Sequence, residues 1–288
     1  MSIRSAVFKC CRLLPDPIFL QLVYYKHFKH FVNFKNPVTF TEKLQWLKLN
    51  YRKPEFTTMV DKYLVKDYVA GKIGREHIIP TIGVWDHPEE IDFDVLPDQF
   101  VLKWNHDSQS IVICRDKSKL DREEAIRKLK SGDKANGYWY GREWPYKNVK
   151  PHIIAEKYLE NNEEGLHDYK VWCFHGEPKY VQYVTGRIQD KTYDTFFDRN
   201  WNNCHLSICN PPMQEDIAKP SGLDKMLELA HILSENLPFA RVDFYILEDG
   251  TILFGEITFY PMAGFCPFHP KEQDEEFGKM IILPEVEK

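Results

Sequence analysis

The sequence predicts a mixed α/β fold of the α+β type, in which helices interleave with mainly antiparallel strands. The clearest helix signal lies between Leu223 and Leu237, where apolar residues recur at helical spacing along one face. Two β-type apolar runs follow it, over residues 239–247 and 251–259, and flank an Asp-Gly pair. Such a pair between two strands is typical of a tight hairpin. Helical segments that alternate with hairpins of this kind indicate the α+β class.

The other elements follow from hydrophobic periodicity and turn-forming residues. Helices are predicted to begin at Thr41, an N-cap candidate, and to cover residues 63–70 and 121–130. Residues 131–150 are rich in glycine and aromatic residues, and we interpret them as a mobile loop or lid. Strands are predicted over residues 78–82, 100–104, 111–114, 153–156, 169–174, 179–185 and 195–198.

Composition and charge exclude several classes of protein. The chain has 288 residues, of which 43% are hydrophobic and 28% charged, as in an ordinary globular protein. Its formal net charge of −5 argues against a broad surface for nucleic acid. No run reaches the roughly 18 apolar residues of a membrane span, so we expect no integral membrane segment. Residues 1–37 are basic and aromatic and are expected to be a helical or irregular packing arm, with peripheral membrane or partner docking as the open alternative.

Cysteine usage predicts the redox compartment. An odd, scattered set in a chain of this length, with no signal-peptide pattern at its start, predicts reduced thiols and a cytoplasmic location. The seven cysteines are Cys10, Cys11, Cys114, Cys173, Cys204, Cys209 and Cys266.

The late hairpin predicts a metal site. If its Asp-Gly pair occupies both central turn positions, Asp243 lies opposite Glu256, and Arg241 lies opposite Thr258. A longer turn would shift this register. Directly opposed carboxylates repel each other, and a hard divalent cation such as Mg²⁺ between them would relieve the repulsion. The alternative is a polar face that is simply hydrated. Side chains alternate along strands, so the polar face also carries Tyr245 and Phe254, and the buried face carries Val242, Phe244, Ile246, Leu253 and Ile257.

Several short motifs in one order resemble a known superfamily. The motifs are Asp61-Lys62-x-x-x-Lys66, Val101-Leu102-Lys103 with the polar turn 105–110, Glu156-Lys157-x-Leu159, Asp168-Tyr169-Lys170, Arg241-x-Asp243 and Glu256-x-Thr258. This order is similar to that of the ATP-grasp superfamily, including the D-alanine–D-alanine ligases. Residues 168–176 and 255–261 resemble signatures of the TupA-like ATP-grasp proteins of bacterial surface-polysaccharide clusters. The resemblance covers roughly residues 38–270, and it implies an ATP-grasp fold that holds a nucleotide between two mainly antiparallel sheets.

The resemblance implies a nucleotide site for ATP. Lys62 and Lys103 match the lysines that contact the phosphates. The loop after Lys103 lacks the glycines common in the superfamily, and His106, Ser108 and Ser110 could supply hydrogen bonds to the phosphates instead. Asp168 matches the acidic residue that accepts hydrogen bonds from the ribose. The adenine hinge matches Glu156, Lys157 and Leu159.

The same resemblance implies the metal and catalytic residues. Asp243 and Glu256 match the Mg²⁺ ligands. Thr258 stands where many members carry asparagine, which leaves a second Mg²⁺ open. Arg241 matches the arginine that stabilises charge on the transferring phosphate, and Lys170 would face the phosphates or the acyl substrate.

The resemblance also implies a division of the chain. We expect a helical N-terminal region over residues 1–60, and the N-terminal part of the ATP-grasp module over 61–100. The small, lid-forming subdomain is expected over 101–158 and the large catalytic subdomain over 159–288.

The implied function is that of an ATP-dependent carboxylate–amine ligase that forms an amide through an acyl phosphate. The carboxylate would be a uronic acid or amino acid, free, nucleotide-linked or polymeric, destined for a capsule, O-antigen or teichuronic polymer, and the second substrate an amine. A glycosyltransferase is the alternative, because Asp92-Phe93-Asp94 is an Asp-x-Asp, although it lies in an acidic stretch typical of a solvated loop. A third hypothesis is a degenerate ATP-grasp protein that only binds.

Overall fold

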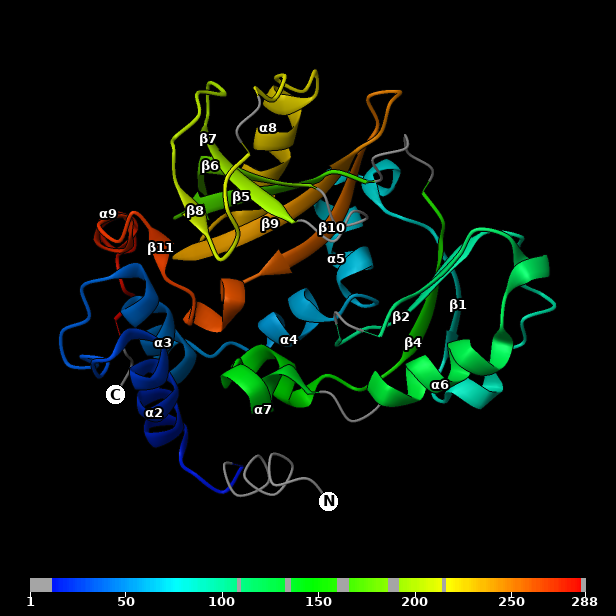
Figure 1. Ribbon diagram of the computed structural model, residues 1–288, viewed down its shortest axis with the longest axis horizontal. Helices are drawn as coiled ribbons and strands as arrows, with labels where there is room; N and C mark the ends of the chain where they lie inside the picture. The colour runs from blue at the N-terminus through cyan, green and yellow to red at the C-terminus, as the bar shows by residue number, and fades with distance from the viewer. Residues whose placement is uncertain are drawn as a thin grey trace.

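Two separate antiparallel sheets carry the fold in a computed structural model of the chain, one at the top of Figure 1 and one at its right. The structure describes residues 12–107, 110–132, 136–159, 166–185, 192–213 and 216–285. The predicted mixed α/β class is confirmed. The α-helices are α2 (Asp16–Phe28), α3 (Phe40–Asn50), α4 (Glu55–Val60), α5 (Val65–Ile73), α6 (Arg122–Gly132), α7 (Gly137–Gly141), α8 (Leu223–Ser234) and α9 (Gln273–Met280).

The larger sheet has the strand order β10-β9-β5-β6-β7, and every neighbouring pair is antiparallel. All seven residues of the central strand β5 are buried, so both faces of the sheet are covered. Helix α8 packs on one face, where the Cys173 thiol lies 3.9 Å from the Ala230 carbonyl oxygen. The strands are β5 (Asp168–Phe174), β6 (Glu177–Thr185), β7 (Tyr193–Asp198), β9 (Phe239–Ile246) and β10 (Ile252–Thr258).

The smaller sheet has the order β1-β4-β2-β3, and its described strand pairs are also antiparallel. Along β2, Phe100, Leu102 and Trp104 are buried, and the Trp104 indole donates a hydrogen bond of 2.8 Å to the Leu129 carbonyl of α6. Lys103 alternates with these residues and therefore points to the other face. The strands are β1 (Thr81–Trp85), β2 (Phe100–Trp104), β3 (Val112–Cys114) and β4 (Ile153–Lys157).

Short 3₁₀ helices and a two-stranded ladder connect these elements. The ladder pairs β8 (Ser207–Ile208) with β11 (Phe268–His269). The 3₁₀ helices are η1 (Arg75–His77), η2 (Pro88–Glu90), η3 (Lys117–Lys119), η4 (Trp144–Asn148) and η6 (Pro261–Gly264).

Helix α3 begins two residues earlier than predicted. Its N-cap is Thr39, whose hydroxyl accepts a hydrogen bond from the Glu42 backbone N–H, while the Glu42 carboxylate accepts one from the Thr39 N–H. This reciprocal pair is a capping box. Thr41, the predicted N-cap, is instead inside the helix and donates its hydroxyl hydrogen to Asp274 at 2.6 Å. The position was wrong because both threonines precede the apolar pattern and only Thr39 has glutamate three residues later.

Residues 136–150 form ordered, packed elements rather than the predicted mobile loop. Asn136 caps α7 by accepting a hydrogen bond from the Tyr138 N–H, and η4 follows. Arg142 is buried, and its guanidinium lies 4.4 Å from the centre of the Phe19 ring of α2. The aromatic residues that suggested a lid therefore pack this segment against the N-terminal helices.

The hairpin of β9 and β10 has the predicted register at its polar end but not at its turn. Asp243 pairs with Glu256, as predicted. The turn contains one more residue than predicted, because Leu247 and Thr251 are joined by a hydrogen bond and Gly250 has φ +84°. A bulge between Phe254 and Glu256 absorbs the extra residue and restores the register.

The same bulge reverses two side chains at the turn end. Phe254 pairs with Phe244 and packs with it in the main core, at 6.4 Å between ring centres. Leu253 pairs with Tyr245 instead. The predicted faces of Phe254 and Leu253 were therefore wrong, because the extra turn residue shifts both by one position.

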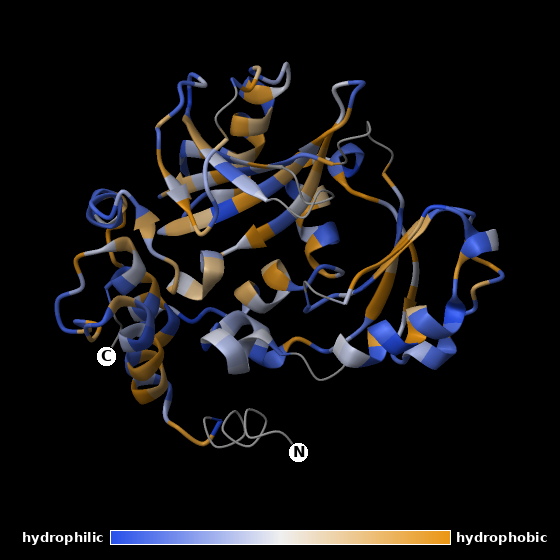
Figure 2. Ribbon diagram, in the orientation of Figure 1, coloured by the Kyte–Doolittle hydropathy of each residue, from blue (hydrophilic) through white to orange (hydrophobic). Residues whose placement is uncertain are grey.

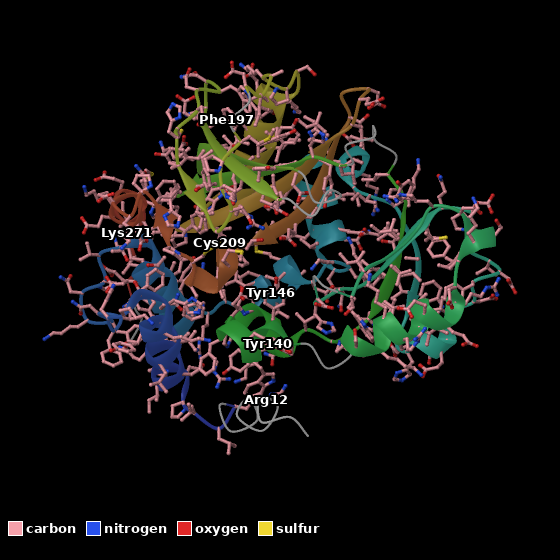
Figure 3. The ribbon with its side chains drawn as sticks, in the orientation of Figure 1. Arg12, Tyr140, Tyr146, Phe197, Cys209 and Lys271 are labelled. Atoms are coloured by element: carbon pink, nitrogen blue, oxygen red, sulfur yellow. A yellow bond between two sulfur atoms is a disulfide. The ribbon has the colours of Figure 1, made fainter. Side chains whose placement is uncertain are left out.

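Two cysteines form a disulfide that the sequence did not indicate. The Sγ atoms of Cys209 and Cys266 are bonded at 2.03 Å, and Cys209 is labelled in Figure 3. The expectation that all thiols are reduced is wrong for this pair. The β8–β11 ladder brings the two residues to a Cα–Cα distance of 6.0 Å although 57 positions separate them in sequence.

Candidate active site

A row of polar side chains crosses four strands of the larger sheet on the face opposite α8. Gln182 of β6 pairs with Lys170 of β5, Lys170 pairs with Asp243 of β9, and Asp243 pairs with Glu256 of β10. Strand alternation sends Arg241 to this same face, next to the row. The backbone register alone therefore gathers these side chains.

Arg241 ties the carboxylates of this row together. Its Nε donates to Asp243 Oδ1 at 2.7 Å and its Nη2 donates to Asp243 Oδ2 at 2.8 Å, which is the bidentate geometry that a guanidinium favours. The same Nη2 lies 3.0 Å from Glu256 Oε1 and 3.1 Å from the Thr258 hydroxyl. Thr258 in turn donates to Glu256 Oε1 at 3.0 Å. The four residues predicted from the hairpin are thus brought together.

Lys170 and Asp168 extend the cluster along β5. The Lys170 ammonium forms a short ion pair with Asp243 Oδ2 and lies 3.5 Å from Asp168 Oδ2. Both side chains are buried. Asp168, the first residue of β5, therefore lies beside the cluster.

Cations outweigh the effect of burial on Glu256. Burial alone would raise the pKa of this carboxyl, but Lys62, Arg241 and Lys170 hold it well below its usual range. Burial would likewise lower the pKa of Arg241, and Asp243 with Glu256 raises it instead. Both opposed carboxylates lie against cations, Arg241 for the pair and Lys170 for Asp243, so the bare repulsion inferred from the sequence is already offset within the protein.

Lys62 joins the two sheets at this point. Its ammonium donates to the Asp107 carbonyl at 3.1 Å, in the turn after β2, and lies 3.9 Å from Glu256 Oε2 of the larger sheet. Asp61 fixes this placement: its carboxylate accepts from the Leu64 N–H at 3.1 Å and from the Asn105 side chain at 2.8 Å. The pKa of Lys62 is lowered. Burial is the largest cause and the nearby charge of Lys103 adds to it, while the carboxylate of Glu256 opposes both effects.

Lys103 belongs to a second cluster on the smaller sheet. Its ammonium lies 2.5 Å from Glu156 Oε2, and the Lys66 ammonium lies 2.7 Å from Glu156 Oε1. Burial alone would raise the pKa of Glu156, but Lys103 and Lys66 together lower it. Lys66 ends the motif Asp61-Lys62-x-x-x-Lys66, and no role was predicted for it. Its other bonds, to the Ile79 carbonyl and the Thr81 hydroxyl, tie α5 to β1.

The predicted hinge lies at the end of β4. Glu156 is buried with its carboxylate held by the two lysines, and Lys157 donates its backbone N–H to the Pro80 carbonyl at 3.0 Å. Leu159 is half-buried and ends the described segment 136–159. Ser108 lies outside the described residues.

Two residues near the carboxylates were missed by the sequence. Tyr146 of η4, labelled in Figure 3, is half-buried; burial first and then the charges of Glu143 and Glu256 raise its pKa well above the usual value. Burial and Glu256 also raise the pKa of Glu143 to about 7, against the opposing effect of Lys48. Nothing in residues 136–148 indicated this proximity, because only the packing of α7 and η4 creates it.

The Asp-x-Asp motif lies away from this site. Asp94 accepts a hydrogen bond from the Arg122 guanidinium at 2.6 Å, and its own N–H donates to Asp92 Oδ1 at 3.0 Å. Both carboxylates are exposed, while Phe93 between them is buried in the core of the smaller sheet. The motif is therefore a surface turn anchored by its phenylalanine.

The chain matches one family of known proteins. The family model described as TupA-like ATPgrasp matches residues 42–282. No curated protein sequence matches the chain.

Solved structures similar to the chain include the D-alanine–D-alanine ligase of Bacillus anthracis complexed with ATP. It is 18% identical, with a TM-score of 0.42, and the match covers 70% of this chain and 55% of that one. D-cycloserine synthetase DcsG is 15% identical with a TM-score of 0.42, over 78% of this chain and 69% of that one. The chain therefore spans about half the length of the first of these structures.

Proposed function

Because the chain belongs to the TupA-like ATP-grasp family, we propose that it is an ATP-dependent carboxylate–amine ligase that works through an acyl phosphate. The observation that carries the proposal is the pairing of Asp243 with Glu256 on one sheet face, with Arg241 bonded to both. Lys62 lies beside Glu256 and Lys103 lies on the facing sheet. This arrangement suits a nucleotide triphosphate that enters between the sheets.

The residues present fit Mg²⁺. Among the described residues no group of three or more histidine, cysteine, aspartate or glutamate side chains gathers as a metal site. Mg²⁺ bound to a nucleotide commonly needs only one or two protein carboxylates, since phosphate and water oxygens complete its shell. Asp243 and Glu256 would hold the ion, with the Thr258 hydroxyl beside them. When bound, Mg²⁺ would neutralise charge on the β- and γ-phosphates.

On ATP binding, phosphate oxygens would replace carboxylate oxygens as the partners of two lysines in the site. We propose that Lys62 and Lys103 turn from Glu256 and Glu156 towards the phosphates, and that Arg241 and Lys170 face the γ-phosphate. Both lysine side chains are only 11% and 16% exposed and each already lies beside a carboxylate, so the positive charge is in place before the nucleotide enters. Asp168 would accept hydrogen bonds from the ribose. The Lys157 N–H is bonded to Pro80, so the purine contact would fall on the chain at and beyond the Lys157 carbonyl, towards Leu159.

The proposed chemistry has two steps. A carboxylate oxygen of the first substrate attacks the γ-phosphorus, the bond to the β-phosphate oxygen breaks, and ADP leaves. The nitrogen of the amine then attacks the acyl carbon, inorganic phosphate leaves, and the amine loses a proton as the amide forms. Arg241 and Lys170 would stabilise the charge that develops on the transferred phosphoryl group. In this scheme no serine or cysteine nucleophile takes part.

The proposed substrates are a uronic acid or amino acid and an amine, joined during the synthesis of a bacterial surface polysaccharide. The resemblance to TupA-like proteins supports this setting. The anchored surface turn at Asp92–Asp94 gives no support to the glycosyltransferase alternative.

We expect ADP, and not AMP, as the nucleotide product. An acyl-phosphate route cleaves ATP between its β- and γ-phosphates, which is where Asp243 and Glu256 would hold Mg²⁺. The measurement is ATP turnover against a panel of amino acids and nucleotide-linked uronic acids, with hydroxylamine present to trap the activated acid as a hydroxamate. Pyrophosphate release, or sugar transfer without ATP consumption, would overturn the ligase proposal.

Substitution of Lys103 tests whether it binds phosphate or only pairs with Glu156. Lys103→Ala is expected to weaken ATP binding by about 10- to 100-fold, which corresponds to the loss of a charge-assisted contact of roughly 1.5–3 kcal/mol. Isothermal titration with ATP and Mg²⁺ measures the affinity. GTP should bind far more weakly than ATP to the unchanged protein, since the two purines present opposite donor and acceptor groups at position 6.

Lys66→Ala is the matched control, because it removes the other cation from Glu156. Lys66 is held by the Ile79 carbonyl and the Thr81 hydroxyl, so its loss should lower stability more than ATP affinity. Equal losses of ATP affinity in both variants would show that Lys103 acts only through Glu156.

A further inference from the structure

Helix α2 exposes an apolar stripe along its outer face. Ile18 is 50% exposed, Leu22 54% and Tyr25 47%, at the spacing that aligns residues on one side of a helix. Phe31, 58% exposed, stacks on Tyr25 with 4.9 Å between ring centres and widens the stripe. These four side chains, which we call the outer patch, form a contiguous apolar surface.

Packing of α2 against the protein does not use the outer patch. The inner face of the helix buries Phe19, Leu20 and Tyr24, which form a small core with Val32 and Phe265. In Figure 2 the helix is largely orange at the lower left, away from both sheets. The helix is therefore apolar on two sides, and only the inner side has a partner among the described residues.

The charge of this region is opposite to that of the whole protein. Residues 12–38 contain four lysines and arginines and a single acidic residue, Asp16, whereas the chain carries a net charge of −5. The negative charge of Asp16 is balanced by an ion pair with Arg52, whose guanidinium lies 2.9 Å from the carboxylate. Lys26 and Lys29 at the C-terminal end of α2 and Lys35 in the segment after it are all exposed. Basic residues around an apolar helix face complement an anionic membrane surface.

We propose that the outer patch of α2 docks onto the headgroup region of an anionic phospholipid bilayer. The apolar side chains would enter the boundary between headgroups and acyl chains, and the surrounding lysines would contact lipid phosphates. In the part of the chain that the structure describes, no helix is long and apolar enough to cross a bilayer, so the association is with one surface. The inference goes beyond the proposed function and does not depend on it.

Sedimentation with lipid vesicles tests the apolar part of the proposal. The protein should pellet with vesicles of phosphatidylcholine and phosphatidylglycerol, and Leu22→Glu should reduce the bound fraction about tenfold or more, because a charge replaces buried apolar area. The matched control is Val95→Glu, since Val95 is 72% exposed and lies between η2 and β2 of the smaller sheet rather than on α2. Unchanged binding in Leu22→Glu would overturn the proposal. Both side chains are exposed, so both variants should keep the melting temperature of the wild type.

Charge removal tests the electrostatic part. Each lysine near an anionic surface contributes about fivefold to binding, so Lys26→Gln with Lys35→Gln should weaken binding about 25-fold, and raised salt should act in the same direction. Equal binding to vesicles of phosphatidylcholine alone would overturn the assignment to anionic lipid. A shift from dimer to monomer in Leu22→Glu, with no vesicle binding by the wild type, would instead make the patch a contact between two copies of this chain.

Discussion

Replacing Glu256 with glutamine is expected to abolish ATP turnover while the chain still folds. Glutamine keeps the shape of the side chain but removes the charge that Lys62, Arg241 and Lys170 stabilise. The loss should exceed about a thousandfold, equivalent to roughly 4 kcal/mol of transition-state stabilisation, because the proposed Mg²⁺ contact would be lost with the charge. The Mg²⁺-dependent part of the rise in melting temperature on adding ATP should disappear as well.

The control for this variant is Glu248→Gln in the exposed turn of the same hairpin, which should turn over ATP at the normal rate. The folded protein holds the pKa of Glu256 below its unfolded value, so its ion pairs stabilise the fold above the unfolded pKa. This contribution is lost as the pH falls towards the folded pKa. Because the side chain is one-third exposed, the loss in Glu256→Gln should be at most about 1 kcal/mol at neutral pH. Normal turnover in Glu256→Gln would remove this residue from the proposed metal site.

In the hairpin of β9 and β10, the predicted pairing of Asp243 with Glu256 is correct although the predicted turn is wrong, because a bulge compensates for the longer turn. The Asp-Gly signal predicted a two-residue turn, but the chain closes the hairpin with three residues between Leu247 and Thr251. The bulge before Glu256 cancels the shift, so the polar pairs are as predicted while Phe254 and Leu253 exchange faces. A bulge at a glycine has no distinctive sequence pattern, so a shift of this kind could not be predicted.

Residues that act through long-range packing were harder to predict. The role of Lys103 as a phosphate ligand comes from the family resemblance and stays a prediction. That its side chain leaves the core of the smaller sheet was predictable, because it alternates with buried residues on β2. Its partnership with Lys66 across Glu156 was not, because it depends on how α5 meets the smaller sheet. The closeness of Tyr146 to the carboxylates and the Cys209–Cys266 bond depend in the same way on contacts between segments far apart in sequence.

Replacing Arg241 with alanine should lower the stability of the protein and make that stability depend on Mg²⁺. Its side chain is 10% exposed and bonds to Asp243, Glu256 and Thr258. Arg241→Ala would leave the two carboxylates opposed with only lysines nearby, and should lower the free energy of unfolding by about 3 kcal/mol. Arg75→Ala, which breaks an exposed pair with Asp67, should change it by less than about 1 kcal/mol.

Mg²⁺ should partly rescue the Arg241→Ala variant without any nucleotide. In the wild-type protein Arg241 and Lys170 occupy both oxygens of Asp243, so Mg²⁺ alone competes with two cations. Removing the guanidinium frees Oδ1 and restores the repulsion between Asp243 and Glu256, and both changes favour a hard divalent ion. Thermal unfolding with and without Mg²⁺ should therefore show a larger rise in melting temperature for Arg241→Ala than for the wild type. The double variant Arg241→Ala, Glu256→Gln should lose the rise, since only one of the paired carboxylates remains. An Mg²⁺ effect equal to that of the wild type would mean that these two carboxylates do not form a metal site.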